Sequence, residues 1–316
     1  MIDSFASPTC DTPPQYQPVV RTVLETILWI AIIAAYIPQY LRIRRSGTTG
    51  ISPYYVLNHS LFSTTTLALR CSHSIFYPAF NCLVSGELQG WKGYSAFLGF
   101  LAVIVQWLCA VMLVVVFICH RTTEPSSDLI EARWLPDRGL HPHKLTSRKM
   151  VIVLSSYVGA TLPLSLALLC FSAHPYFQQE QPRRAFYVVF WSVWVALLCA
   201  ADAFLVVFQF IKQMKTVGRL RTGGSLSIVS VGMQTVVLLL LSIAQFYRSR
   251  KSIILRKEPH MGFGRFVRVF VFVYGCFSVD IMYIVAGLGY LVLFQLCLLF
   301  GWNDMFGDRF GRIQLI

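Results

Sequence analysis

Apolar residues gather in stretches of about 20 residues along this chain, and short polar segments separate the stretches. Such a stretch, folded as a helix, is long enough to cross the ~30 Å hydrocarbon core of a bilayer. The pattern therefore predicts an all-α, polytopic membrane protein. We expect seven transmembrane helices, over residues 19–41, 53–69, 94–119, 150–171, 186–210, 226–247 and 279–302.

Two of these stretches carry residues that are uncommon in a simple apolar span. The second contains Ser60, Ser63 and Thr64 to Thr66, and a bundle interior tolerates such hydroxyls because they bond to helix carbonyls or to a neighbouring helix. The fourth contains Pro163, and a transmembrane helix accepts the resulting kink because neighbouring helices re-satisfy the freed carbonyl. Both stretches are therefore kept as spans.

The segment 248–278 does not fit the alternation of spans and short loops. Seven basic residues lie between 248 and 268, and the apolar run from 266 to 302 is too long for one span and too short for two. We expect an irregular basic or interfacial segment over 248–278, followed by the last span. An error in this part of the gene sequence would explain the mismatch equally well.

Charged residues make up 13% of the chain, against roughly 25% in soluble proteins, so no soluble catalytic domain fits beside the spans. The net charge of +13 would suggest nucleic acid in a soluble protein. Here the basic residues fall in short loops, where they set orientation and meet anionic lipid head groups. We therefore expect contacts with membrane lipid and no nucleic-acid partner.

The basic residues are concentrated in the odd-numbered loops. The first loop holds Arg42, Arg44 and Arg45, and the loop 120–149 holds six more Lys and Arg residues. Because short loops rich in Lys and Arg stay in the cytosol, we expect these loops to be cytosolic. The flexible N-terminal tail, residues 1–18, is then lumenal or extracellular, and residues 303–316 form a C-terminal tail.

The residues that metal sites and intramembrane enzymes need are not arranged in their usual patterns. The nine cysteines lack the spacing of zinc sites, and no DxxD pair is present for metal–diphosphate chemistry of a prenyl- or terpene-processing enzyme. We expect no catalytic residue, no metal and no cofactor. The chain is predicted not to be an enzyme.

An internal repeat appears after the first and fifth spans. The first copy reads YIPQYLRIRRSGTTGISPYYV and the second VFQFIKQMKTVGRLRTGGSLSIVSV. In both, a helix ends in a Gln-containing pair, and a basic stretch, Gly and Thr, and an aliphatic–Ser pair follow. We pair Gln39 with Gln209 and Ser52 with Ser227, which leaves 13 residues in one copy and 18 in the other. The repeat predicts two three-helix units, 19–119 and 186–302, joined by a cytosolic loop, 120–149, and a linking helix, 150–171.

These motifs resemble those of the PQ-loop repeat family, which includes cystinosin-type exporters and SWEET sugar transporters, and fungal members most of all. The matching residues are Pro38 and Gln39 with Gly50 to Ser52, and in the second copy Gln209 with Gly224 to Ile228. Phe208 stands where the second motif's proline should be. The resemblance implies a transporter in an endomembrane similar to that of a vacuole or lysosome. The C-terminal third resembles the family poorly.

Polar residues inside apolar spans are functional candidates, because an unpaired polar group in hydrocarbon costs several kcal/mol. A proline removes one helix hydrogen bond and provides a bend, so Pro38 is a candidate hinge. The candidate hinge or gate residues are Pro38, Gln39, Phe208 and Gln209, and the candidate substrate ligands are Asn58, His59 and Gln234.

Two carboxylates within or at the edge of spans, Asp202 and Asp280, are candidates for proton coupling. Each could equally pair with a polar group on a neighbouring helix. The resemblance weakens the coupling hypothesis, because cystinosin-like members carry a carboxylate where Gln234 stands here.

Together these features predict a transporter of a small polar solute, such as an amino acid or a sugar, that alternates access between its two repeats. The alternative is a seven-helix receptor of similar architecture that binds cargo or ligand without moving it. A homo-oligomer is compatible with either function.

Overall fold

The computed structural model describes residues 19–46, 51–72, 90–120, 146–173, 181–220, 226–254 and 279–300. The expected tails, 1–18 and 303–316, lie outside these residues. So do most of the loop 120–149 and residues 255–278 of the expected irregular segment.

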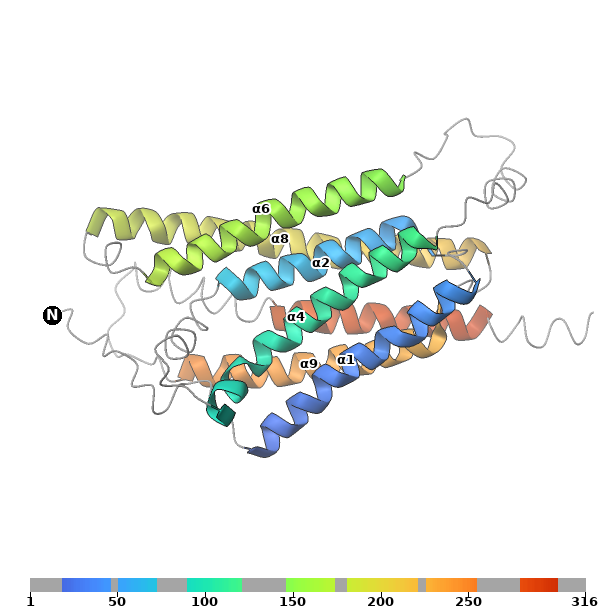
Figure 1. The fold of residues 1–316 in the computed structure, drawn as a ribbon, viewed down its shortest axis with the longest axis horizontal. Helices are drawn as coiled ribbons and strands as arrows, with labels where there is room; N and C mark the ends of the chain where they lie inside the picture. The colour runs from blue at the N-terminus through green and yellow to red at the C-terminus, as the bar shows by residue number, and fades with distance from the viewer. Residues whose placement is uncertain are drawn as a thin grey trace, which may run out of the picture.

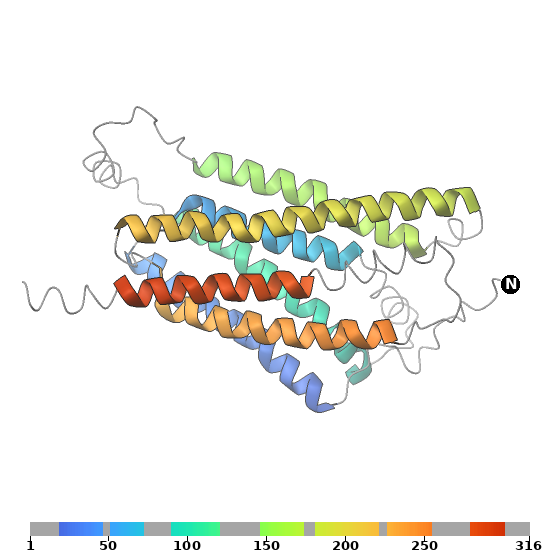
Figure 2. The same ribbon diagram turned by 180° about the vertical axis from the view of Figure 1, so that it is seen from behind.

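The described residues form long α-helices that run side by side (Figures 1 and 2). Proline and glycine mark several boundaries: α2 begins at Pro53, and α4 begins at Gly90, whose φ of 58° suits a residue without a side chain. The helices are α1 (Val19–Ser46), α2 (Pro53–Ser72), α4 (Gly90–Cys119), α6 (Ser147–Ala173), α8 (Gln181–Leu220), α9 (Ile228–Ile254) and a final helix (Val279–Phe300).

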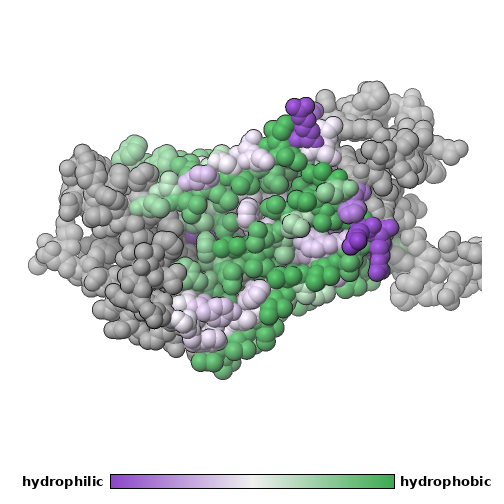
Figure 3. Space-filling model, viewed as in Figure 1, coloured by the Kyte–Doolittle hydropathy of each residue, from purple (hydrophilic) through white to green (hydrophobic). Residues whose placement is uncertain are grey.

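Six of these helices are long and apolar enough to cross a membrane, which confirms an integral, multi-pass α-helical membrane protein. Their outer faces are apolar, and Figure 3 shows this surface across the middle of the molecule. The six are α1, α4, α6, α8, α9 and the final helix. The helix α2, expected as the second span, is not among them.

The helix α2 is less apolar than the others because its surroundings are protein. Every residue from Tyr55 to Ser72 is buried, and α2 packs against α4, α6 and α8. Its hydroxyls are satisfied inside the protein: Thr64 and Thr65 bond to the carbonyls one turn earlier. The Thr65 hydroxyl also meets Tyr157 of α6, and Trp107 of α4 donates to Thr64. A helix enclosed in this way needs no apolar outer face.

The first two helices each pack against a helix from the second half of the chain. The helix α1 lies against α9 as well as α4, and α2 lies against α8. The final helix closes the bundle beside α8 and α9, where Gly289 faces Phe210 and Gly287 faces Leu239 (Figure 2). Segments far apart in sequence therefore meet along the whole interior.

Several helices extend beyond the spans expected from hydropathy. The helix α1 continues to Ser46, and α8 has 40 residues, about 60 Å of helix against ~30 Å of hydrocarbon. The helix α9 continues to Ile254, so the first part of the expected irregular segment is helical. Hydropathy marks only the part of a helix that lipid surrounds, and these ends are polar and basic.

We predict that Gly289→Ala destabilises the bundle. A Cβ at Gly289 would overlap the ring of Phe210, and overpacking of this kind costs about 1–3 kcal/mol. Gly159→Ala in α6 is the matched control, because nothing lies within 4 Å of its added Cβ. Thermal unfolding in detergent should show a lower melting temperature for Gly289→Ala alone. Equal melting temperatures would contradict the close packing of the final helix on α8.

Candidate functional site

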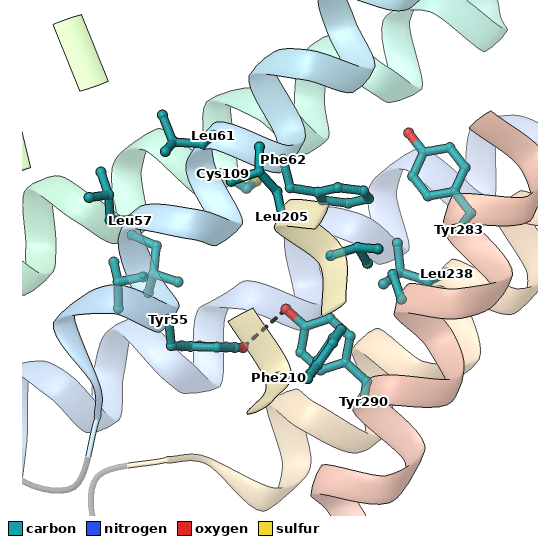
Figure 4. Packing of buried hydrophobic residues seen from close by; sticks show 14 of the residues in the cluster. Tyr55, Leu57, Leu61, Phe62, Cys109, Leu205, Phe210, Leu238, Tyr283 and Tyr290 are labelled. Carbon is teal, nitrogen blue, oxygen red and sulfur yellow. Dashed lines mark hydrogen bonds between the residues drawn. The ribbon is translucent and has the colours of Figure 1, made fainter. Parts of the chain in front are cut away.

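A histidine enclosed by three tyrosines lies where both halves of the chain meet. His59 of α2 is buried, and its Nε2 atom lies 2.6 Å from the hydroxyl of Tyr36 in α1. Its Nδ1 atom lies 3.4 Å from the hydroxyl of Tyr290 in the final helix. Tyr55 stacks on the imidazole and donates a 3.0 Å hydrogen bond to Tyr290 (Figure 4). Sequence reasoning singled out His59 and missed all three tyrosines.

These bonds form a continuous chain with consistent donors and acceptors. Tyr55 donates to Tyr290, and Tyr290 can then donate to Nδ1 of His59. An imidazole that accepts at one nitrogen carries its proton on the other, so Nε2 donates to Tyr36. The chain needs only a neutral histidine, and it joins α1, α2 and the final helix.

Gln209 approaches the same histidine from α8. Its amide is close enough to interact with the imidazole, yet neither of its amide atoms has a partner of hydrogen-bonding geometry. Gln209 is completely buried, and an unsatisfied buried amide costs about 1–3 kcal/mol. The sequence predicted that Gln209 is a gate residue, and the structure places Gln209 beside His59 and its tyrosine neighbours.

A buried ion pair lies toward the other end of α2. Arg70 donates a 3.1 Å bond to Asp280 of the final helix, and both side chains are at most 4% exposed. The hydroxyl of Tyr283, one helical turn beyond Asp280, is buried without a partner. Tyr283 projects into the bundle interior (Figure 4) and interacts electrostatically with Arg70, Asp202 and Asp280.

Asp202 is the second buried carboxylate of this region. It lies on α8, is fully buried, and its Oδ1 is 3.4 Å from the Thr66 hydroxyl of α2. Its Oδ2 has no partner. The two carboxylates predicted from sequence thus lie in one region but in different states, because Asp280 has a guanidinium partner and Asp202 does not.

These groups lie along one face of α2. Tyr55, His59, Thr66 and Arg70 are separated by multiples of about one helical turn, so they follow the same side of the helix. Their partners come mostly from α8 and the final helix. We call this set the α2 column: Tyr55, His59, Thr66 and Arg70, with Gln209, Asp202, Asp280, Tyr283 and Tyr290 opposite.

Two glutamines make equivalent bonds across the bundle. The side-chain oxygen of Gln39 in α1 accepts a 2.7 Å bond from the backbone N–H of Ser227, which precedes α9. The oxygen of Gln213 in α8 accepts a 3.0 Å bond from the backbone N–H of Ser52, which precedes α2. Each glutamine therefore satisfies a backbone donor at the start of a helix in the other half.

This reciprocity changes the register of the repeat. The residue equivalent to Gln39 is Gln213, not Gln209, and Lys212 stands where the first copy has Pro38. Gln213 precedes Ser227 by 14 residues, close to the 13 between Gln39 and Ser52.

Phe208, expected near the gate, lies at the bundle's edge. It stacks on the exposed Phe204, and the Lys212 ammonium lies 5.2 Å from the centre of its ring.

The spacing from the helix-opening serines also relates two of the predicted ligands. His59 and Gln234 each lie seven residues after their helix-opening serine, so Gln234 corresponds to His59. Gln234 donates a 3.4 Å bond to the hydroxyl of Ser230 in its own helix. Asn58 is buried, and its Nδ2 has no partner. The structure brings His59 and Gln209 together, whereas Asn58 Nδ2 and Gln234 Nε2 are not hydrogen-bonded to each other.

Pro38 lies inside α1 at the contact with α9. Ser230 of α9 donates a 2.5 Å hydrogen bond to the carbonyl of Ala35, three residues before the proline. Pro38 removes the helix bond to the carbonyl of Ala34, so Ser230 bonds at the residue next to the one whose carbonyl is freed. The predicted hinge therefore has a partner on the other half.

The residues that the sequence analysis missed were inconspicuous for two reasons. The tyrosines count as apolar in a span, whereas Arg70 and Gln213 lie beyond the apolar cores of their spans. Spacing could have found some of them, since Tyr55, His59, Thr66 and Arg70 share a helix face. Their partners on the final helix could not be assigned without the fold.

Comparison with known proteins adds no family assignment. A scan of family models, a search of curated proteins and a search of solved structures each return no match for this chain.

We predict that Gln39→Leu and Gln213→Leu each destabilise the protein. Each leaves a buried backbone N–H unpaired, which costs about 1–3 kcal/mol. Gln106→Leu in α4 is the matched control, because both amide atoms of Gln106 are buried without partners. Thermal unfolding should therefore show lower melting temperatures for the first two variants and an unchanged or higher one for Gln106→Leu. The reverse order would rule out the reciprocal bonds.

Proposed function

We propose that this protein is a membrane carrier for a small polar solute, such as an amino acid or a sugar. The observation that carries the proposal is the α2 column, a buried line of polar side chains between the two halves of the bundle. Transporters built from parallel repeats bind their substrate between the repeats near the bilayer midplane. The column has this position relative to the halves and contains several polar atoms without partners.

Unpartnered buried atoms are informative because proteins seldom keep them. More than nine in ten buried polar groups have a partner, and each exception needs a reason. In this region the exceptions include the Gln209 amide, Asp202 Oδ2 and the Tyr283 hydroxyl. A solute that brings its own hydroxyl, amino or carboxyl groups would satisfy them. We assign Asn58, His59, Gln209 and Gln234 to solute binding.

In the proposed architecture α1, α2 and α4 form one half, and α8, α9 and the final helix form the other. The helix α6 links them, so seven helices are arranged as 3+1+3, with α2 as an enclosed span. The reciprocal bonds of Gln39 and Gln213 support this division, because a twofold arrangement of repeats would exchange them.

The two glutamines and Pro38 suit the moving parts of a carrier. The Gln39–Ser227 and Gln213–Ser52 bonds hold the same end of the bundle closed, because both lie where a loop enters the next helix. Pro38 provides the bend next to one of them. Opening that end would break both bonds and bend α1.

We propose that this end faces the cytosol. Exposed basic residues gather there at the end of α1 and the start of α6, namely Arg44, Arg45, Arg148 and Lys149 (Figure 3). The N-terminus is then lumenal or extracellular. The PQ-loop resemblance favours an endomembrane of vacuolar or lysosomal type, with a carrier rather than an enzyme in it. Membrane lipid is the expected surround, and several copies can assemble in it.

We expect uptake of a polar solute into liposomes that contain the protein. The assay is a screen of isotope-labelled pools of amino acids and sugars, followed by single solutes. Gln209→Leu should abolish uptake, because it removes the free amide beside His59, and Gln106→Leu should retain it. Binding of a solute without any uptake would instead favour the ligand receptor.

Pro38→Ala should slow uptake by restoring a helix hydrogen bond and stiffening α1, while leaving the melting temperature unchanged or higher. Pro163→Ala in α6 is the matched control, since it restores the same bond in the linking helix. The initial rate of uptake of the identified solute is the measurement. A normal rate in Pro38→Ala would exclude the hinge.

A further inference from the structure

Asp202 is a buried carboxylate without a counter-charge. It is fully buried on α8, Oδ2 has no partner, and Oδ1 has only the Thr66 hydroxyl at 3.4 Å. An ionised carboxylate in this position is expensive, and a protein lowers the cost by protonation or by pairing. In this arrangement Asp202 therefore needs a proton or another positive charge.

The hydrogen bonds of the Thr66 hydroxyl indicate whether Asp202 carries a proton or needs a positively charged partner. A hydroxyl has one proton to donate and can accept two bonds. Thr66 donates that proton to the carbonyl of Phe62 at 3.0 Å, and a carbonyl can only accept. The 3.4 Å contact between Thr66 and Asp202 is long, and because the Thr66 proton is already used, the carboxyl group has to supply the proton for it. The geometry fits a carboxylic acid.

Arg70 is the positive charge on the helix face that contacts Asp202, and it is engaged with another carboxylate. Arg70 lies one helical turn beyond Thr66 on the same face of α2 and is bonded to Asp280. Its Nε has no partner. Tyr283 interacts electrostatically with Arg70, Asp202 and Asp280, so one guanidinium and two acidic side chains belong to the same region.

The ion pairs among the described residues are Arg70–Asp280 and Arg21–Glu25, and neither includes Asp202. The linking helix contributes Tyr157, which interacts electrostatically with Asp202 and whose hydroxyl is bonded to Thr65. Within the part of the chain that the structure describes, the third buried carboxylate beside Asp202 and Asp280 is Glu25 on α1, which pairs with Arg21.

We propose that Asp202 carries an exchangeable proton, and that Arg70 pairs with Asp280 while the proton is bound and with Asp202 after it leaves. The step breaks the O–H bond of Asp202, and the proton passes to water. The carboxylate that remains takes the unchanged positive charge of Arg70. Asp280 lies near the described start of the final helix. After the exchange, water that enters at this end of the bundle solvates its carboxylate.

This exchange would couple proton release to opening of one end of the bundle. The Arg70–Asp280 pair joins α2 to the final helix, which belong to different halves. Removing Arg70 from Asp280 frees the final helix from α2, whereas the new pair with Asp202 keeps α2 on α8, so the opening is confined to the side of the final helix. The proposal extends the carrier function proposed above, and it gives Asp202 and Asp280, both predicted from sequence, different roles.

The proton is tested first, without any solute. Infrared difference spectra of the full chain in liposomes, between acidic and alkaline buffer, should contain the carbonyl band of a protonated carboxylic acid. The band should be lost in Asp202→Asn and shifted in Asp202→Glu, which keeps an acid in a folded protein. Glu25→Gln is the matched control and should keep the band. Retention of the full band in Asp202→Asn would overturn the proposal.

The exchange of partners is tested with a native probe. Cys71 is a buried free thiol next to Arg70, and its alkylation by a maleimide, followed by mass spectrometry, reports opening at this end. At one alkaline pH, Asp202→Asn should be labelled several-fold more slowly than the wild type, because Arg70 stays with Asp280. Asp280→Asn should be labelled several-fold faster, and Glu25→Gln at the wild-type rate.

Faster labelling of Cys71 in Asp202→Asn would mean that the residue is merely structural and would overturn the exchange. Both experiments are independent of transport. If uptake is found but the infrared band is insensitive to Asp202, the carrier function stands and this inference fails. If the band and the labelling behave as expected but no solute is moved, this inference stands and the carrier function fails.

Discussion

The fold depends on keeping the polar helix α2 away from lipid. Its hydroxyls, its histidine and its arginine would be costly in hydrocarbon, where no water is available to solvate them. The structure meets this constraint by surrounding α2 with α4, α6 and α8, which present lipid-facing surfaces of their own. The surrounding helices can present apolar outer faces because the least apolar helix is enclosed and their own polar residues face the interior.

Enclosure also places polar chemistry where the halves of the chain meet. Because α2 packs on α8 and faces the final helix, its polar face is paired with residues that lie more than 130 positions away in sequence. The contacts there include hydrogen bonds and one ion pair, and they lie within an apolar core to which both halves contribute. Hydrogen bonds are directional, so they restrict the possible arrangements of this interface more than apolar packing alone would.

The sequence predicted the membrane-spanning helices well because span length depends only on local hydrophobicity. It singled out His59, Asp202 and Asp280, all of which are buried in the bundle, for the same reason, since an intramembrane polar residue stands out against an apolar background. It did not identify Gln213 as the counterpart of Gln39, because the two repeats were aligned with loops of unequal length. It failed at Arg70 because the helix continues past the residue where hydropathy falls. Pairings such as Arg70 with Asp280 depend on topology, which local sequence does not contain.

The reciprocal glutamine bonds have a consequence for how the protein is made. The N–H of Ser52 is satisfied by Gln213, which is synthesised 161 residues later. At ordinary translation speeds that delay is on the order of ten seconds. During this time α2, the least apolar helix, has left the ribosome while α8, one of its main neighbours, does not yet exist. The nascent first half must therefore be sheltered by the insertion machinery until the second half arrives, so the two halves are partners in assembly before they can be partners in function.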